Sequence, residues 1–147
     1  MKPLEKLLGP PDVLELKEIE KPTVDEDEVL IKVYAASVNY SDWSFVRGKP
    51  FLVRLIGSGL LKPENTILGA DIAGRVESVG ANVKQFKPGD EVFGDVSDCG
   101  YGGFAEYVCA TEDVLALKPS NLTFEETAAA PQAAVVALQG LRDKGQI

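Results

Sequence analysis

The densest group of chemically versatile side chains is residues 39–43, which place an amide, a phenol, a hydroxyl, a carboxylate and an indole in a row. This run follows a strongly apolar stretch, and polar loops held by rigid strands are frequent binding and catalytic sites. The simpler interpretation is an Asx-type turn with Trp43 in the core, and the composition of the run favours it. Both interpretations stay open at this point.

Several other kinds of chemistry are disfavoured by what the chain lacks. It contains no histidine, which removes Ser-His and Cys-His nucleophiles and every histidine-ligated metal site. Its two cysteines, Cys99 and Cys109, form no CxxC pair and cannot make the usual closed zinc site. Because the chain shows no sign of secretion, we expect two reduced thiols and no metal.

Three groups of glycines invite comparison with phosphate-binding loops. Residues 57–59 lack a third glycine and a preceding strand. Residues 69–74 have the glycine spacing of a P-loop, but Arg75 stands where that loop requires lysine. Residues 99–103 have no helix after them whose dipole could meet a phosphate. We therefore expect turns and bulges at all three places.

Composition limits the class of protein and its partners. The chain has 147 residues, 45% of them hydrophobic, and a formal net charge of -8, which predicts one ordinary globular domain. The acidic balance argues against a nucleic-acid partner, which would need a basic face. No apolar run has the length of a membrane span, and the first residues carry no apolar leader. We expect no nucleic-acid partner, no membrane partner and a cytoplasmic location.

Short apolar runs separated by glycine, proline and acidic turns are typical of a β-rich barrel or sandwich. We expect strands over residues 12–19, 28–36, 71–79, 91–96, 103–110 and 114–117. A helical turn is expected around Asp42, and a long loop over residues 48–68. Gly74 suggests a bulge or a close backbone approach, and Pro88 followed by Gly89 is the pattern of a type II turn.

The last residues change to helical signals. Thr123 and Glu126 have the spacing of a capping box, and Pro131 is suited to the first turn of a second helix over residues 132–144. That helix is largely apolar and needs a surface to cover, so we expect the natural protein to continue beyond Ile147. We divide the chain into a β domain, residues 1–122, and a helical segment, residues 123–147, which we expect to connect to a further part of the protein.

Ordered motifs of a known family extend over nearly the whole chain. The matching stretches are residues 9–14, 29–42, 69–74, 76, 79–80, 86–94, 103–108 and 128–141. On these motifs the sequence resembles the N-terminal, GroES-like catalytic domain of the medium-chain dehydrogenase/reductase superfamily, and most closely its zinc-free quinone oxidoreductase branch. The resemblance implies a mainly β fold, a GroES-like partly open β-barrel with a short C-terminal helical segment. It also implies that the Rossmann half is absent from these residues.

The resemblance also maps the metal positions of the zinc-dependent members. Their ligands fall on Asn39, Ala70 and Gln132, and Ala70 has no donor atom. The lobe that holds a structural zinc in such members would lie near residues 95–103, where Cys99 is the only cysteine. A zinc-free reductase is therefore implied, in which hydrogen-bond donors and the cofactor polarise the substrate.

By the same mapping, the nicotinamide cleft is lined by residues from two motifs. Asn39 is expected to contact cofactor or substrate, and Tyr40 to act as a wall or proton donor. Asp42 is included among the expected cofactor-binding residues, although we expect its main role to be the orientation of its own loop. Gln132 and Val136 are expected to face the nicotinamide, and Val136 stands where many relatives have a carboxamide-binding threonine.

The resemblance implies an enzyme that transfers hydride from NADPH to a quinone or α,β-unsaturated carbonyl, assembled as a homo-oligomer, with these residues inactive alone. No G-x-G-x-x-G fingerprint follows a strand in this chain. Residues 2–8 depart from the family, since their apolar spacing is closer to a helix than to a strand. Two alternatives therefore stay open: a non-catalytic binding module that keeps the barrel, and an engineered stand-alone scaffold.

Overall fold

The computed structural model describes residues 10–48 and 67–147. Within them, one antiparallel five-stranded sheet has the order β4-β1-β2-β3-β5. The strands are β1 (Glu28–Ala36), β2 (Asp71–Val79), β3 (Glu91–Asp95), β4 (Tyr107–Thr111) and β5 (Leu115–Leu117). The outer strands β4 and β5 are not neighbours, so the sheet stays open, and the expectation of a mainly β, partly open fold is confirmed.

The core lies against the central strands, whose residues are mainly β-branched and aliphatic. β1 contributes Val29 and Ile31, and β2 contributes Ile72 and Val76, all of them buried. β1 pairs with β2 on one side and with β4 on the other, and Ile31 lies opposite Val76 and Val108. This double pairing fixes the direction of β1 and of the residues that follow it.

Glycine is required at two of the places where the sequence indicates it. A Cβ on Gly74 would meet the carbonyl oxygen of Lys32 on β1 at 2.2 Å, and the β1–β2 register shifts beside it, between Val33 and Ala35. Gly89 has a φ of 96°, and the Asp90 N–H donates to the Lys87 carbonyl at 3.2 Å, which closes the expected turn. Both predictions are confirmed.

Two predicted strands are wrong in whole or in part. Residues 12–19 form no strand: Pro11–Val13 is a 3-10 turn, and the following stretch leaves Leu14, Leu16 and Ile19 exposed. The alternation of apolar residues there finds no neighbouring strand, and a strand needs a ladder as well as a pattern. Residues 103–106 precede β4 as turns, because Gly103 donates to the Gly69 carbonyl at 2.9 Å instead of joining the β4 ladder.

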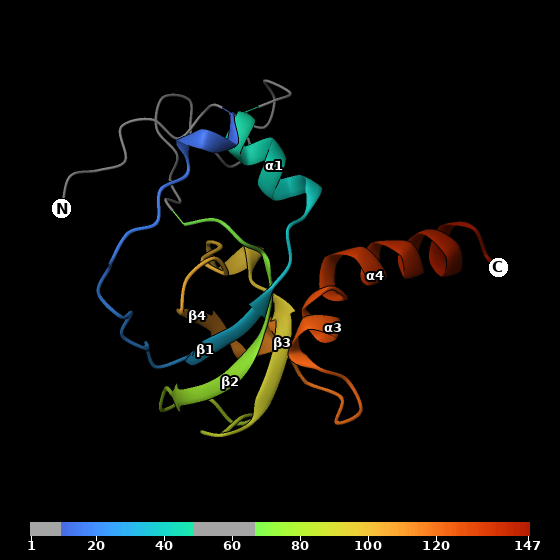
Figure 1. Cartoon of the computed structure of the whole chain (residues 1–147). Coiled ribbons are helices and arrows are strands. Elements are labelled where there is room, and N and C mark those ends of the chain that lie inside the picture. Colours follow the sequence, from blue (N-terminus) through green and yellow to red (C-terminus); the bar gives the residue numbers. More distant parts are fainter. Residues whose placement is uncertain (1–9, 49–66) are drawn as a thin grey trace.

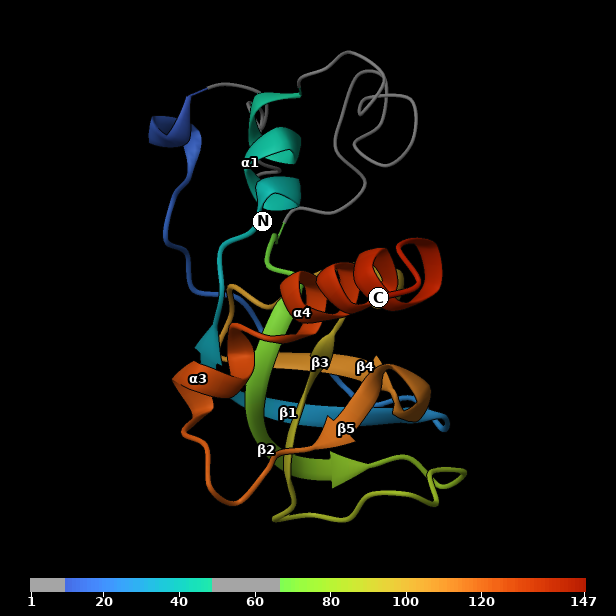
Figure 2. The same ribbon diagram turned by 90° about the vertical axis from the view of Figure 1, so that its right-hand side faces the viewer.

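The helices gather at one end of the sheet (Figures 1 and 2). They are α1 (Tyr40–Arg47), α3 (Phe124–Ala128) and α4 (Pro131–Leu138), which continues as a π-helical segment, η4 (Gln139–Lys144). The predicted capping box is present: Thr123 Oγ1 accepts from the Glu126 N–H at 3.2 Å, and Glu126 Oε2 accepts from the Thr123 N–H at 2.9 Å. Pro131 stands in the first turn of α4, as expected.

The described residues also contain three short 3-10 helices: η1 (Pro11–Val13), η2 (Ser97–Cys99) and η3 (Glu112–Val114). Cys99 and Cys109 are free thiols, as the sequence predicts. No helix in the described ranges is long and apolar enough to cross a membrane. The predictions for residues 2–8 and 57–59, and nearly all of the predicted loop 48–68, lie outside the described residues.

Candidate functional site

Strand ends bring polar residues together at one edge of the sheet. In an antiparallel sheet, the end of one strand lies beside the start of the next. β1 ends just before Ser37, β2 begins at Asp71 and β3 ends at Asp95, and Asp71 lies directly opposite Asp95 in the register. α1 and α4 begin at this same edge, so their first residues meet these polar groups.

Asp42 fixes the start of α1. Its side chain is only 2% exposed, Oδ2 accepts from the Asn39 N–H at 2.8 Å, and Oδ1 accepts from the Gly69 N–H at 3.1 Å. Burial raises the pKa of Asp42 above its ordinary value, although these backbone hydrogen bonds act in the opposite direction. Asp42 therefore ties α1 to the segment before β2.

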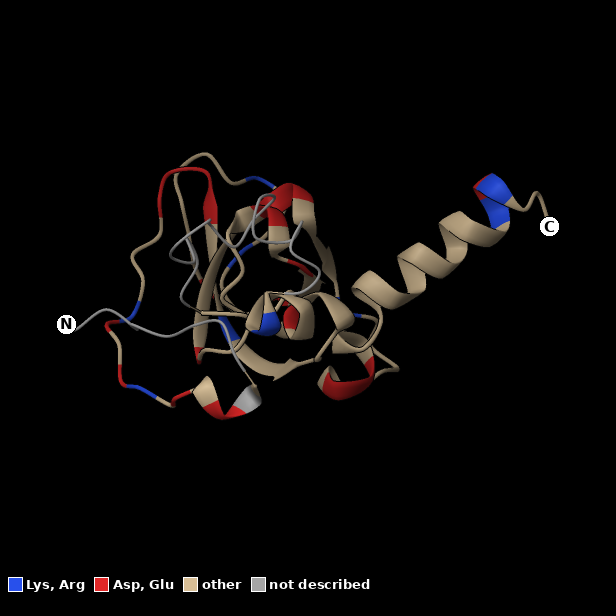
Figure 3. Cartoon of the chain, turned by 90° about the horizontal axis from the view of Figure 1, so that it is seen from above, with Lys and Arg blue, Asp and Glu red and all other residues tan. Residues whose placement is uncertain are grey.

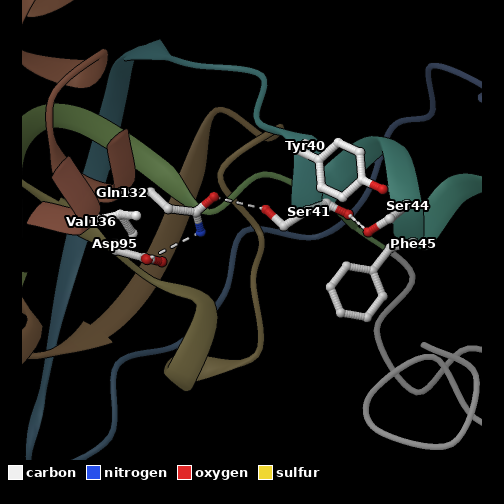
Figure 4. A pocket seen from close by; sticks show the side chains of 7 residues that line it. All are labelled: Tyr40, Ser41, Ser44, Phe45, Asp95, Gln132 and Val136. Carbon is white, nitrogen blue, oxygen red and sulfur yellow. Dashed lines mark hydrogen bonds between the residues drawn. The ribbon is translucent and has the colours of Figure 1, made fainter. Parts of the chain in front are cut away.

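A hollow, here called the α1–α4 pocket, lies between these helices and the end of β3 (Figure 4). It has a volume of about 540 Å³. The lining residues are Tyr40, Ser41, Ser44 and Phe45 from α1, Asp95 from β3, and Gln132 and Val136 from α4. Hydroxyl, carboxylate and carboxamide groups thus share one space with aromatic and aliphatic surface.

Gln132 connects the elements around the pocket. Its Oε1 accepts from the Ser41 hydroxyl at 3.0 Å, and its Nε2 donates to Asp95 Oδ2 at 3.4 Å (Figure 4). Its backbone N–H donates to Asp71 Oδ2 at 3.1 Å. The other oxygen of Asp95 accepts from the Ser97 N–H at 2.9 Å. α1, β2, β3 and α4 are therefore joined through this one residue.

Asp71, which accepts from the Gln132 N–H, is completely buried. Its Oδ2 also accepts from the Ser37 hydroxyl at 3.4 Å, and Oδ1 has no hydrogen-bond partner among the described residues. Burial raises the pKa of Asp71, and the nearby charge of Asp95 adds to the shift. Asn39 donates from Nδ2 to Ser37 Oγ at 3.3 Å, so a polar chain runs from Asn39 to Gln132.

Phe45 forms part of the apolar wall of the α1–α4 pocket and packs against Tyr101. Its ring meets the ring of Tyr101 edge-on, with centroids 5.2 Å apart. Tyr101 has a φ of 66°, a left-handed conformation that is strained for a bulky residue, and it stands between Gly100 and Gly102. Burial raises the pKa of Tyr101, with a smaller contribution from the charge of Asp42.

The structure divides the predicted site residues into two groups. Tyr40, Gln132 and Val136 line the α1–α4 pocket. Asn39 and Asp42 lie at the start of α1 and make hydrogen bonds within the protein.

Sequence reasoning missed other groups at the site: Ser44, Phe45, Asp71 and Asp95. The two aspartates carried a usable signal, since Asp71 begins one predicted strand and Asp95 lies next to the last residue of the following one, and antiparallel pairing brings these positions together.

The pocket suits a flat, uncharged ring that carries an amide or carbonyl. Its carboxamide and hydroxyls can both donate and accept hydrogen bonds, and Val136 and Phe45 offer apolar contact. Among the described residues, no lysine or arginine lines it, so the part of the pocket they form does not suit a phosphate. Among the residues that the structure describes, no group of three or more Cys, Asp or Glu is arranged to hold a metal ion.

Comparison with known proteins supplies the family context. Residues 25–120 match the family model described as "Alcohol dehydrogenase GroES-like domain". A 2-methylene-furan-3-one reductase of Solanum lycopersicum is 40% identical over 144 residues, covering 93% of this chain and 35% of that protein. A chloroplastic NADPH-dependent alkenal/one oxidoreductase of Arabidopsis thaliana is 40% identical over 140 residues, covering 90% of this chain and 34% of that protein.

Solved structures show the same fold. The quinone oxidoreductase from Coxiella burnetii superimposes with a TM-score of 0.81 at 34% sequence identity, covering 94% of this chain and 43% of that one. The chain thus spans about a third of the length of these two relatives, 35% and 34%, and 43% of this structure.

Proposed function

The chain belongs to the family of alcohol dehydrogenase GroES-like domains, and we propose that it is the substrate-side domain of an NADPH-dependent oxidoreductase. Such an enzyme would transfer hydride to a quinone or an α,β-unsaturated carbonyl. The names of relatives support this choice, since one is an NADPH-dependent alkenal/one oxidoreductase and another a quinone oxidoreductase. Residues 1–122 would form the barrel, and residues 123–147 would lead into a dinucleotide-binding domain.

The observation that carries the proposal is the placement of the Gln132 carboxamide in a pocket with hydroxyl groups and apolar walls. NADPH, when bound, would supply the hydride. Gln132 and Ser41 would orient an uncharged carbonyl or carboxamide by hydrogen bonds, and Val136 and Phe45 would pack against a ring. Tyr40, which is 73% exposed at the pocket, would form an outer wall or donate a proton. Asn39 would add a polar contact and Asp42 would hold its loop.

We propose that this chemistry needs no zinc in this chain. The three positions that match zinc ligands in other family members carry Asn39, Ala70 and Gln132, and the Ala70 side chain is a buried methyl group. Hydrogen-bond donors would therefore stabilise the negative charge that develops on the substrate oxygen. The second N–H of Gln132 would be one such donor, because its first is directed at Asp95.

The rest of such an enzyme would cover α4. Val135, Val136, Leu138 and Leu141 are each at least half exposed, and the helix extends away from the sheet (Figure 3). Figure 3 also shows no charged residue along α4, and the charged cluster near the C-terminus lies in η4, whose last turn contains Arg142 and Lys144. An apolar face of this kind is suited to burial against another domain or subunit. We propose a dinucleotide-binding domain there, a homo-oligomer overall, and a location in the cytoplasm.

An assay of NADPH oxidation tests the proposal. The product of the whole reading frame that encodes this chain is expected to oxidise NADPH with a panel of quinones and enones, and the 147-residue chain alone is expected to show little or no turnover. Robust turnover by the chain alone would contradict the assignment of these residues to one half of the enzyme. Binding of the same compounds without turnover by the whole product would favour a non-catalytic binding module instead.

A further inference from the structure

The start of α4 has no capping group of its own. The first N–H groups of a helix have no partner within the helix and need an acceptor from outside it. The residue before α4 is Ala130, whose side chain cannot accept, and Pro131 has no N–H. The Gln132 N–H is therefore the first donor of the helix, and it finds Asp71 Oδ2 at 3.1 Å.

The residue opposite Asp71 holds the other end of the same glutamine. Asp71 on β2 pairs with Asp95 on β3 in the sheet register. Asp95 Oδ2 accepts from Gln132 Nε2 at 3.4 Å, while Oδ1 is fixed by the Ser97 N–H at 2.9 Å. One cross-strand pair of carboxylates thus accepts from the backbone and from the side chain of a single residue.

This arrangement leaves one orientation for the Gln132 carboxamide. An ionised carboxylate only accepts hydrogen bonds, so the nitrogen must face Asp95. The oxygen then faces the Ser41 hydroxyl, which donates to it at 3.0 Å. Among the described residues, one N–H of Nε2 and one lone pair of Oε1 remain for a ligand in the α1–α4 pocket.

We propose that Asp71 and Asp95 act as a pair of positioning residues that hold the backbone and the carboxamide of Gln132, so that its remaining N–H is presented to an uncharged carbonyl or amide group. The chemical class of that ligand rests on the proposed function, whereas the positioning itself does not. Asp71 is suited to this task because it is fully buried and its Oδ2 also accepts from the Ser37 hydroxyl, which restricts its orientation.

Hydrogen exchange of backbone amides in the ¹⁵N-labelled chain tests the Asp71 half of the pair. In Asp71→Ala, the Gln132 N–H is expected to exchange about tenfold faster or more, the factor that accompanies loss of a hydrogen bond to a charged group. The Ala134 N–H is the internal control, because it donates to the Ala130 carbonyl within the helix at 2.8 Å. Asp71→Asn keeps an acceptor oxygen and is expected to restore protection in part.

Each other outcome overturns the proposal. If Gln132 and Ala134 accelerate together, Asp71 supports the fold in general and does not position Gln132. If neither changes, Asp71 is not the acceptor. If Asp71→Ala fails to fold, the exchange rates of Gln132 and Ala134 are compared between Asp71→Asn and the unchanged chain. Asn keeps only one of the two carboxylate oxygens, so faster exchange of Gln132 alone supports the proposal, and any other result overturns it.

The side-chain NH₂ resonances of Gln132 test the Asp95 half. Asp95→Asn is expected to shift them, while Asp98→Asn, a change at a nearby exposed carboxylate in η2, is expected to leave them in place. Equal spectra for both variants would overturn the role of Asp95. These measurements need no substrate, so a failure of hydride transfer in the whole enzyme would refute the proposed function and leave the positioning pair standing.

Discussion

Single carboxylates decide how the site is built. Asp42 and Asp71 each accept from a backbone N–H in a distant segment of the chain, whereas Asp95 accepts from the Ser97 N–H two residues further on. An acceptor in such a position stabilises the fold chiefly by preventing buried donors from losing their partners. The polar run 39–43 in the sequence indicated a candidate binding or catalytic site at this position. It could not show that Asp42 is directed inward, toward Gly69, because that contact joins segments 27 residues apart.

Removing the Asp42 carboxylate should therefore be costly. Asp42→Ala leaves the N–H groups of Asn39 and Gly69 without their acceptor, and we expect a loss of about 2–3 kcal/mol in the free energy of unfolding. Urea denaturation at neutral pH measures it. Asp98→Ala, at an exposed position in η2, is the matched control and should change stability by less than about 0.5 kcal/mol. Equal stability of the two variants would show that Asp42 does not anchor α1.

At the scale of elements, the signals that predict correctly are local ones. The capping box at Thr123, the proline at the start of α4 and the β-branched residues of β1 each act within a few residues of themselves. The predicted strand over residues 12–19 fails because its alternation has no partner strand. The α1–α4 pocket was only half predictable, since Asp95 and Phe45 reach it through the pairing of distant strands and the direction of α1.

Gly74 offers a test of the β1–β2 pairing. In Gly74→Ala, the new methyl group would meet the Lys32 carbonyl oxygen at 2.2 Å, so the strands must separate. We expect a loss on the order of 3 kcal/mol in the free energy of unfolding. Gly140→Ala is the control, because nothing lies within 4 Å of its Cβ and it stands in the helical segment η4. That change should stabilise the protein by about 0.5–1 kcal/mol, and a stable Gly74→Ala variant would contradict the close approach.

At the scale of the whole molecule, buried and exposed carboxylates act in opposite directions as the pH changes. Burial raises the pKa of Asp42 and Asp71 above 3.8, so the folded state takes up their protons first. At neutral pH the buried, ionised side chains of Asp42 and Asp71 destabilise the folded state to the full extent. This destabilisation is relieved as the pH falls through their raised pKa. Ion pairs and hydrogen bonds lower the pKa of Glu77, Glu91 and Glu112 below 4.5, so their stabilisation is lost only as the pH falls below that value.

These directions predict two opposite changes: a gain in stability as the pH falls through the raised pKa of Asp42 and Asp71, and a loss as the pH falls below about 4.5. Asp71→Asn removes one of the two titrating groups. The difference in unfolding free energy between this variant and the unchanged chain should therefore vary with pH, moving in favour of the unchanged chain as the pH is lowered. Urea denaturation at a series of pH values measures this difference. A constant difference from pH 7 to pH 4 would contradict the raised pKa of Asp71.

The central claim is that this chain forms one wall of a site where hydride passes from NADPH to an uncharged carbonyl compound. The most direct measurement follows deuterium from labelled NADPH to the β-carbon of an enone, in the product of the whole reading frame and in its Gln132→Ala and Gln139→Ala variants. We predict transfer in the unchanged protein, at least about tenfold lower kcat/KM in Gln132→Ala, and little change at the exposed Gln139. Absence of transfer across a panel of enones and quinones, or equal kcat/KM in all three proteins, would contradict the account.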